Sequence, residues 1–278
     1  MKKKITVFIA AICAVTLLLP SQLFCLAAGD DPIKLPVIMY HLVEDKHLGK
    51  DVISTQEFES DLKYLAENNY TTVTIRDVVD YIYDGRPLPE KPIILTFDDG
   101  YVNTYRVVFP IIKKYHVKIV VSVIGKAVDD FSLHPSNSEF AHATWAQLVE
   151  MTRSGCVELQ NHTYNMHANG SPRIGCEQKA GETFEKYEHI MAEDVINCQQ
   201  SIYQWTGAVP CAFTYPYGRY NENTDKILKS LGFKATLTCN FGINRLYAGD
   251  PDCLYDLKRP CRSHNYSLEK LVAEIDKL

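Results

Sequence analysis

Runs of apolar residues and segments with helical periodicity alternate along most of the chain. The run Pro92–Phe97 is apolar without alternation, which is typical of a strand buried on both faces, as in a parallel sheet. Further strands are predicted at residues 36–40, 71–75, 118–124, 156–160, 212–215 and 234–238.

Helices are predicted between these strands. Ser54 and Glu57 have the spacing of a capping box, and Phe58, Leu62 and Leu65 follow on one helical face. Other helices are predicted at residues 78–83, 107–115, 144–155, 183–205 and 224–231. Strands that alternate with helices in this way indicate an α/β fold, and their number favours a distorted (β/α)7-type barrel in a single domain.

Residues 1–28 have the pattern of a secretory signal peptide. Three lysines at positions 2–4 precede an apolar stretch at residues 5–19, and small residues suited to cleavage follow. The apolar stretch is short for a membrane span. We therefore expect the folded domain to comprise residues 29–278 and to be secreted or held at the cell surface.

The charge of the chain excludes some partners. The net charge is −5, and it becomes −8 without the three lysines of the predicted signal peptide. This argues against binding to nucleic acid or to anionic surfaces by charge alone. The chain has no internal repeat or low-complexity linker, and nothing in it indicates a protein partner.

Seven cysteines follow the predicted signal peptide, and no two of them form a C-x-x-C pair. A zinc ribbon or a thioredoxin-type site is therefore not indicated. Export would permit disulfides, and Cys253 with Cys261 is a candidate pair. Burial of the cysteines as small apolar side chains is the equal alternative.

Two carboxylates follow the apolar run Pro92–Phe97. Asp98 and Asp99 come directly after it, and Gly100 permits a sharp turn at that point. The carboxyl ends of parallel strands are where α/β folds place their chemistry. We therefore expect both carboxylates to face one cleft.

Two histidines provide candidate metal ligands. His162 follows a predicted strand, and His167 lies five positions later, a spacing that does not put both side chains on one face of a helix. The imidazoles must instead converge from a strand end or a loop. With Asp99 they would form a His₂Asp site with open positions for water and substrate, which suits zinc first and also cobalt, nickel or iron. Asp98, left free of the metal, could then act as a general base.

The order of three motifs resembles the polysaccharide deacetylase family (NodB homology domain, carbohydrate esterase family 4). The motifs are Thr96-Phe97-Asp98-Asp99-Gly100, then His162-Thr163 with His167, then Tyr215-Pro216-Tyr217-Gly218. The resemblance covers residues from about 36 to 270. It implies a distorted barrel and metal-dependent removal of N- or O-acetyl groups from glycans. It also implies that Asp98 is the general base and that Asp99, His162 and His167 bind the metal.

The resemblance extends to other residues of the site. It implies that the backbone near Tyr215 stabilises the oxyanion and that Pro216 and Tyr217 shape the pocket. The five-residue histidine spacing is similar to that of the branch acting on poly-β-1,6-N-acetylglucosamine. In that branch an N-terminal Tyr-His pair supplies the general acid, and Tyr40 followed by His41 matches it.

The sequence departs from the family pattern at one position. Thr214 stands where the family has an arginine that orients the base. Arg259 is a candidate to contact Asp98 or the substrate, with a surface or structural salt bridge as the equal alternative. His264 is the rival general acid, although an exposed loop position is favoured for it. Tyr164 could stack on a sugar ring or pack against the protein.

The leading hypothesis is a secreted metal-dependent hydrolase that removes N-acetyl groups from an N-acetylglucosamine-containing polysaccharide of a cell wall or exopolysaccharide. An O-acetyl esterase acting on a xylan-like glycan would use the same machinery. A non-catalytic glycan-binding module is favoured slightly by Thr214, and it is opposed by the intact set of candidate base and metal ligands.

Overall fold

The computed structural model describes residues 31–136, 138, 140–170 and 172–278. At its centre is a parallel sheet of seven strands in the order β12-β11-β8-β7-β6-β2, with β5 paired to the start of β6. The strands of this sheet are β2 (Val37–Tyr40), β5 (Thr71–Thr72), β6 (Pro92–Phe97), β7 (Ile119–Val123), β8 (Val157–Asn161), β11 (Ala212–Thr214) and β12 (Ala235–Leu237).

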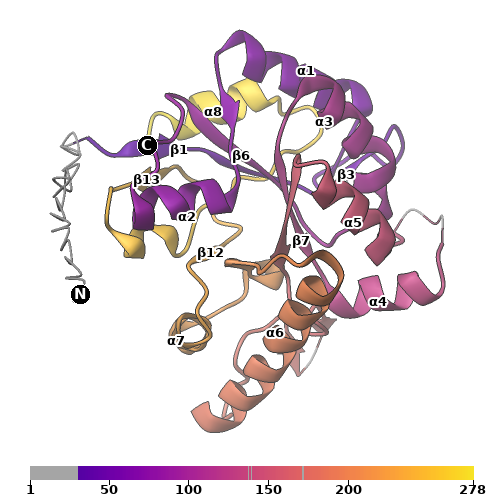
Figure 1. Cartoon of the computed structure of the whole chain (residues 1–278), viewed down its shortest axis with the longest axis vertical. Helices are drawn as coiled ribbons and strands as arrows, with labels where there is room; N and C mark the ends of the chain where they lie inside the picture. The colour runs from indigo at the N-terminus through magenta and orange to yellow at the C-terminus, as the bar shows by residue number, and fades with distance from the viewer. Residues whose placement is uncertain (1–30, 137, 139, 171) are drawn as a thin grey trace, which may run out of the picture.

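The helices lie around the outside of this sheet, with β6 and β7 in the middle (Figure 1). The α-helices are α1 (Thr55–Glu67), α2 (Ile75–Asp84), α3 (Phe109–Tyr115), α4 (Gly125–Leu133), α5 (Trp145–Arg153), α6 (Phe184–Thr206), α7 (Glu222–Ser230) and α8 (Leu268–Ile275). A π-helical turn, η1 (Thr104–Val108), precedes α3, and two 3₁₀ turns are η2 (Pro216–Gly218) and η3 (Pro251–Leu254).

Three small strand pairs complete the described secondary structure. They are β1 (Ile33–Leu35) with β13 (Asn244–Leu246), β3 (Leu42–Val43) with β4 (Val52–Ile53), and β9 (Asn169–Gly170) with β10 (Arg173–Ile174). The last pair lies within the long segment between residues 167 and 183, for which no element was predicted.

The sheet is curled, and residues 257–261 lie between its two edge strands. Leu257 forms a parallel bridge with Leu237 of β12, and Cys261 forms one with Met39 of β2. The amide of Met39 donates to Pro260 O at 3.1 Å, and its carbonyl accepts from the amide of Arg262 at 2.9 Å. The predicted distorted barrel is therefore confirmed, and an irregular C-terminal segment bridges its open side.

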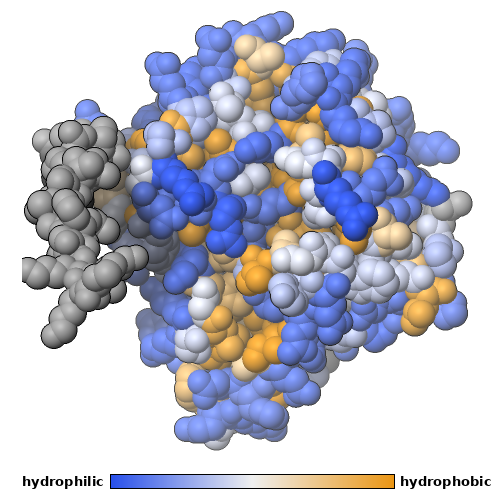
Figure 2. All heavy atoms as spheres, in the orientation of Figure 1, coloured by the Kyte–Doolittle hydropathy of each residue, from blue (hydrophilic) through white to orange (hydrophobic). Residues whose placement is uncertain are grey.

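Burial follows the sequence pattern. Every residue of β6 and of β7 is buried, as expected for strands covered on both faces. Helix α1 begins with the predicted capping box, and its face carrying Phe58, Leu62 and Leu65 packs into the core. The face of the molecule in Figure 2 is mostly hydrophilic, with apolar side chains showing only in patches.

Some predicted boundaries are wrong. The strand predicted at residues 71–75 ends at Thr72, because Thr74 and Asp77 form a capping box that begins α2 at Ile75. Helix α4 was not predicted, since it begins at Gly125 without a side-chain cap. Of the two alternatives left open for the cysteines, the Cys253–Cys261 disulfide is not formed, because all seven cysteines of the described residues are free thiols and Cys261 Sγ donates to Lys50 O at 3.5 Å.

The predicted signal peptide lies outside the described residues, so export remains a prediction. Within the part of the chain that the structure describes, no helix combines the length and apolar character needed to cross a membrane.

Glu57 connects the start of α1 to the C-terminal segment. Its carboxylate accepts from the amide and hydroxyl of Ser54, from the amide of Asn265 at 2.9 Å, and it pairs with His264 Nδ1 at 2.9 Å. Burial opposes ionisation, but these hydrogen bonds outweigh it and lower the pKa of Glu57 to about 2.

Glu57→Gln should therefore change how stability depends on pH. A carboxyl whose pKa is lower in the folded state stabilises it above the unfolded pKa near 4.5, and this contribution is lost as the pH falls toward 2. We expect the substitution to remove on the order of 1 kcal/mol at neutral pH, after allowing for solvent screening. Urea unfolding from pH 7 to pH 2.5 measures this, and Glu59→Gln on the same helix is the control. An unchanged pH slope in Glu57→Gln would refute the assignment.

Candidate metal centre

The candidate site lies at the carboxyl ends of β6 and β8. Asp98 and Asp99 follow β6 directly, and His162 follows β8, while His167 comes from the loop that continues toward β9. These four residues line a cavity of about 630 Å³. The structure therefore brings together the two motifs that are far apart in the sequence, as predicted.

Three ligand atoms converge at this place. Asp99 Oδ1 lies 3.5 Å from His162 Nε2 and 3.2 Å from His167 Nε2. All three ligand atoms lie within 4.8 Å of one another. Asp99 Oδ1 is buried, and among the described atoms it has no hydrogen-bond partner of good geometry. A buried carboxylate oxygen without a donor is expensive unless a cation satisfies it, so this donor set fits a divalent metal.

The ring of His162 is oriented for this role. Its Nδ1 lies 2.8 Å from Thr214 O, so Nδ1 carries the proton that is donated and Nε2 keeps its lone pair for a metal. Burial alone would lower the pKa of His162, but the carboxylates of Asp99 and Asp98 outweigh it and raise this pKa. The raised pKa favours the protonated ring of His162, and a bound cation would displace that extra proton.

The ring of His167 is held by Tyr217. Its Nδ1 lies 3.2 Å from the Tyr217 hydroxyl, and the two ring centroids are 4.5 Å apart. Burial, with the nearby His162, lowers the pKa of His167 to about 4. This histidine is therefore neutral near pH 7, which is the form that binds a metal.

The backbone at Asp99 is strained. Its φ of 70° lies in the left-handed region, and Gly100 follows with φ 74°. A Cβ on Gly100 would lie 2.9 Å from a side-chain carbon of Val123, so only glycine fits this turn. His142 Nδ1 lies 2.8 Å from Asp99 O and holds the strained carbonyl in place. Sequence analysis did not assign His142 to the site, because it lies in a loop between helices, without a motif around it.

Asp98 is held away from the metal ligands by a buried arginine. Arg259 Nη1 and Nη2 donate to the two oxygens of Asp98 at 2.7 and 2.8 Å, and both side chains are buried. Arg259 also donates to Thr96 Oγ1 at 3.0 Å and to Thr238 O at 2.8 Å. Burial would raise the pKa of Asp98, but the Arg259 guanidinium lowers it below its usual value. Asp98 is thus a carboxylate at neutral pH.

The contact between Arg259 and Asp98 explains why Thr214 can stand where the family pattern has an arginine. The Thr214 hydroxyl is buried and lies 2.7 Å from Ser122 Oγ, so it makes no contact with Asp98 that replaces an arginine. Arg259 reaches Asp98 from the C-terminal segment instead. Of the two interpretations offered for Arg259, the structure supports contact with Asp98.

His41 stands at the end of β2 and lines the same cavity. Its Nδ1 lies 3.9 Å from Asp51 Oδ1, and its side chain is 21% exposed. Asp51 was not predicted, because no sequence motif links it to His41. The structure therefore places a candidate acid within the cavity, beside a carboxylate that can orient it.

Tyr215, Pro216 and Tyr217 do not contribute equally to the cavity. The amide of Tyr215 donates to Leu237 O at 3.1 Å and its hydroxyl donates to Asp225, so neither group faces the site. Pro216 is buried at the start of η2. Tyr217, by contrast, lines the cavity with a φ of 58°. Any backbone contribution from this motif must therefore come from Tyr217 rather than from Tyr215 itself.

Two residues suggested from the sequence lie elsewhere. His264 pairs with Glu57 and does not line the cavity. The Tyr164 hydroxyl donates to Asp129 Oδ2 at 2.8 Å, and its ring packs against the core, so the packing alternative is the one observed. Tyr101 lines the cavity although no motif predicted it, and burial beside Asp99 raises its pKa.

The arrangement is suited to hydrolysis. A divalent cation held by Asp99, His162 and His167 would act as a Lewis acid that polarises a carbonyl and lowers the pKa of water. Asp98 is an ionised carboxylate beside this cluster, and its two oxygens accept hydrogen bonds from Arg259. His41 lines the same cavity and is the candidate proton donor.

Comparison with known proteins identifies related sequences. The family model described as "Polysaccharide deacetylase" matches residues 85–236. The chain is 29% identical over 260 residues to poly-beta-1,6-N-acetyl-D-glucosamine N-deacetylase of Escherichia coli K12, covering 86% of this chain and 38% of that protein. It is 28% identical over 214 residues to the putative polysaccharide deacetylase YxkH of Bacillus subtilis, covering 77% of this chain and 67% of that protein. The chain thus spans little more than a third of the length of the Escherichia coli relative.

Solved structures share the fold over nearly the whole chain. IcaB from Ammonifex degensii has a TM-score of 0.71 and 29% identity, covering 87% of this chain and 96% of that one. The Streptococcus pyogenes deacetylase PplD, solved in complex with acetate, has a TM-score of 0.71 and 25% identity, covering 88% of this chain and 99% of that one.

Arg259→Met should destabilise the fold, because it leaves the buried Asp98 charge without its partner. We expect the free energy of unfolding to fall by about 3–5 kcal/mol, measured by denaturant unfolding. The double substitution Asp98→Asn/Arg259→Met should lose less than the sum of the two single changes, because it removes both charges. Lys114→Met, which breaks an exposed pair with Glu59, is the control. Additive losses would show that the buried pair is not coupled.

Proposed function

The chain belongs to the polysaccharide deacetylase family, and from this premise we propose that it is an exported, metal-dependent hydrolase that removes N-acetyl groups from an N-acetylglucosamine-containing polysaccharide. The observation that carries the proposal is an ionised carboxylate, Asp98, held off the metal ligands by Arg259 next to the cluster of Asp99, His162 and His167. Because the pair also holds the C-terminal segment in place, turnover rather than the pair itself separates a hydrolase from a binding module.

The proposed substrate rests on the relatives. Several similar proteins are named poly-beta-1,6-N-acetyl-D-glucosamine N-deacetylases, from Escherichia coli and from staphylococci. The related PplD deacetylase was solved with acetate, which is the product that removal of an acetyl group releases. Export is supported by the pattern of residues 1–28, and it would bring the enzyme to a matrix or cell-wall glycan.

In the proposed reaction, Asp98 accepts a proton from the attacking water, and Arg259 keeps the carboxylate aligned and ionised beforehand. The backbone N–H of Tyr217 is our candidate for a donor to the developing oxyanion, since Tyr217 lines the cavity while the Tyr215 amide is already bonded. His41 donates a proton to the departing amine, with the Asp51 carboxylate 3.9 Å from its Nδ1.

Asp98→Asn should abolish turnover without preventing metal binding. Removing the base is expected to reduce the rate of acetate release by roughly 10²–10⁴-fold, while equilibrium dialysis still finds metal on Asp99, His162 and His167. Acetate release is measured from β-1,6-linked N-acetylglucosamine oligomers, chitooligosaccharides and acetylated xylan with defined metals added back. Near-normal turnover in Asp98→Asn would reject the assignment of the base. A preference for acetylated xylan would make the protein an O-acetyl esterase instead.

His41→Ala and His264→Ala distinguish the two candidate acids. We expect His41→Ala to reduce turnover by roughly 10²–10⁴-fold, because His41 lines the cavity that also holds Asp98 and the metal cluster, whereas His264 does not. His264→Ala should retain turnover and lose only some stability, since its partner is Glu57. Both are measured by acetate release and by thermal unfolding. The reverse pattern would transfer the acid role to His264.

A further inference from the structure

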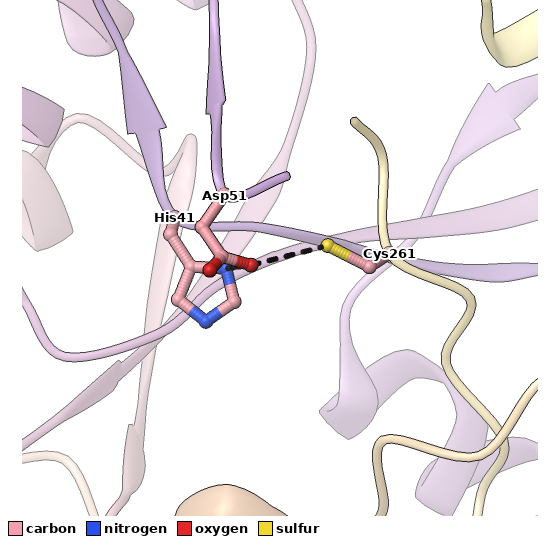
Figure 3. A group of neighbouring side chains, drawn as sticks. All are labelled: His41, Asp51 and Cys261. Carbon is pink, nitrogen blue, oxygen red and sulfur yellow. Dashed lines mark hydrogen bonds and ion pairs between the residues drawn. The ribbon is translucent and has the colours of Figure 1, made fainter. Parts of the chain in front are cut away.

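A second group of metal-ligating side chains lies beside the cavity, which two of its three members, His41 and Asp51, line. His41, Asp51 and Cys261 each offer a ligand atom, and these atoms all lie within 4.8 Å of one another. Figure 3 shows the side chains of the three residues turned toward a common point, with Cys261 approaching from a different segment of the chain. None of the three belongs to the cluster of Asp99, His162 and His167.

The distances suit a small, thiophilic cation. His41 Nδ1 lies 3.9 Å from Asp51 Oδ1, and Cys261 Sγ lies 3.7 Å from the same oxygen. Zinc bond lengths in a tetrahedral site place neighbouring N, O and S ligands roughly 3.3–3.6 Å apart. A contraction of up to about half an ångström would therefore bring the two distances to the Asp51 oxygen into this range. Asp51 is 53% exposed, so its side chain can adjust.

The group is also incompletely satisfied without a cation. His41 Nδ1 is buried, and among the described atoms it has no hydrogen-bond partner of good geometry. The other ring nitrogen points away from Asp51 and Cys261 (Figure 3). Cys261 Sγ has only weak contacts, at 3.5 Å to Lys50 O and 3.7 Å to Asp51 Oδ1. Three donors, one of them an unsatisfied imidazole nitrogen, thus lie close together.

The fold fixes this convergence. His41 directly follows β2, and Asp51 directly precedes β4. Cys261 is bridged to Met39 at the end of the segment that lies across the open side of the barrel. Elements that are about 210 residues apart in the chain therefore hold the thiol beside the carboxylate.

We propose that His41 Nδ1, Asp51 and Cys261 Sγ form a second metal site, distinct from the cluster of Asp99, His162 and His167, for a thiophilic divalent cation such as Zn²⁺ or Cd²⁺. A fourth position opens to the cavity, where water completes the tetrahedron. On binding, the S–H bond breaks, the sulfur–metal bond forms and the proton leaves to solvent. The softer ligand set distinguishes this site from the all-nitrogen-and-oxygen set of Asp99, His162 and His167.

The site is expected to be weaker than the hydrolytic one. Burial, together with the charge of Asp51, raises the pKa of Cys261 to about 12, so a cation must displace a firmly held proton. The site would fill only when the free cation is in excess. If His41 is the proposed general acid, a cation on Nδ1 fixes its ring and adds positive charge beside it, so filling should inhibit turnover. This consequence rests on the proposed function, whereas the site itself does not.

Cobalt titration tests the site without reference to activity, because only a thiolate ligand gives a near-ultraviolet sulfur-to-cobalt charge-transfer band. Wild-type protein titrated with Co²⁺ should bind two equivalents, and the second should bring the band. Cys261→Ser should lose the band and one equivalent, with the thermal unfolding temperature checked against wild type. Asp99→Asn should lose the other equivalent and keep the band.

Cys239→Ser is the matched control, because Cys239 lines the same cavity but lies outside the proposed ligand set. It should keep both equivalents and the band. A band that persists in Cys261→Ser, that disappears in Cys239→Ser, or that is absent from wild type would overturn the proposal. In a separate arm, excess Zn²⁺ should inhibit acetate release by wild type at least tenfold more strongly than release by Cys261→Ser. Equal inhibition of wild type and Cys261→Ser by Zn²⁺ would overturn the regulatory consequence. If the protein released no acetate at all, the cobalt charge-transfer band would still show whether the site exists.

Discussion

The structure depends on one buried ion pair, Arg259 with Asp98. Two charges buried together are stable only when each satisfies the other and the remaining polar atoms find partners, and here Thr96 and Thr238 complete the set. The pair has two consequences. It keeps Asp98 ionised and directed away from the metal ligands, and it secures the C-terminal segment across the open side of the barrel. The same ion pair therefore keeps the reactive carboxylate ionised and closes the fold.

The backbone near this pair is arranged for the same purpose. Asp99 takes a left-handed conformation that a non-glycine residue rarely adopts, and Gly100 and His142 support it. As a result, two adjacent carboxylates separate, with Asp98 toward Arg259 and Asp99 toward the two histidines. One short turn thus divides the roles of base and ligand between neighbouring residues.

Local features of the fold could be predicted from the sequence, because they depend on near neighbours. The buried strand β6, the capping box of α1 and the turn at Gly100 are examples, and the motifs containing Asp98 and His162 indicated the metal cluster. Arg259 and His142 could not be placed from the sequence, since each contacts a residue far along the chain, and no motif links Asp51 to His41. Arg259 lies 161 positions from Asp98, and only the closed barrel brings them together. The sequence could not indicate which amide near Tyr215 faces the cavity, because the bond from the Tyr215 amide to Leu237 of β12 is formed only in the folded sheet.

A crystal structure of the zinc-loaded protein, with anomalous diffraction collected at the zinc edge, tests the central claim most directly. The account predicts the strongest peak between Asp99 Oδ1, His162 Nε2 and His167 Nε2, with Asp98 still paired to Arg259. A peak coordinated by Asp98, or no peak beside Asp99 at saturating zinc, would contradict it.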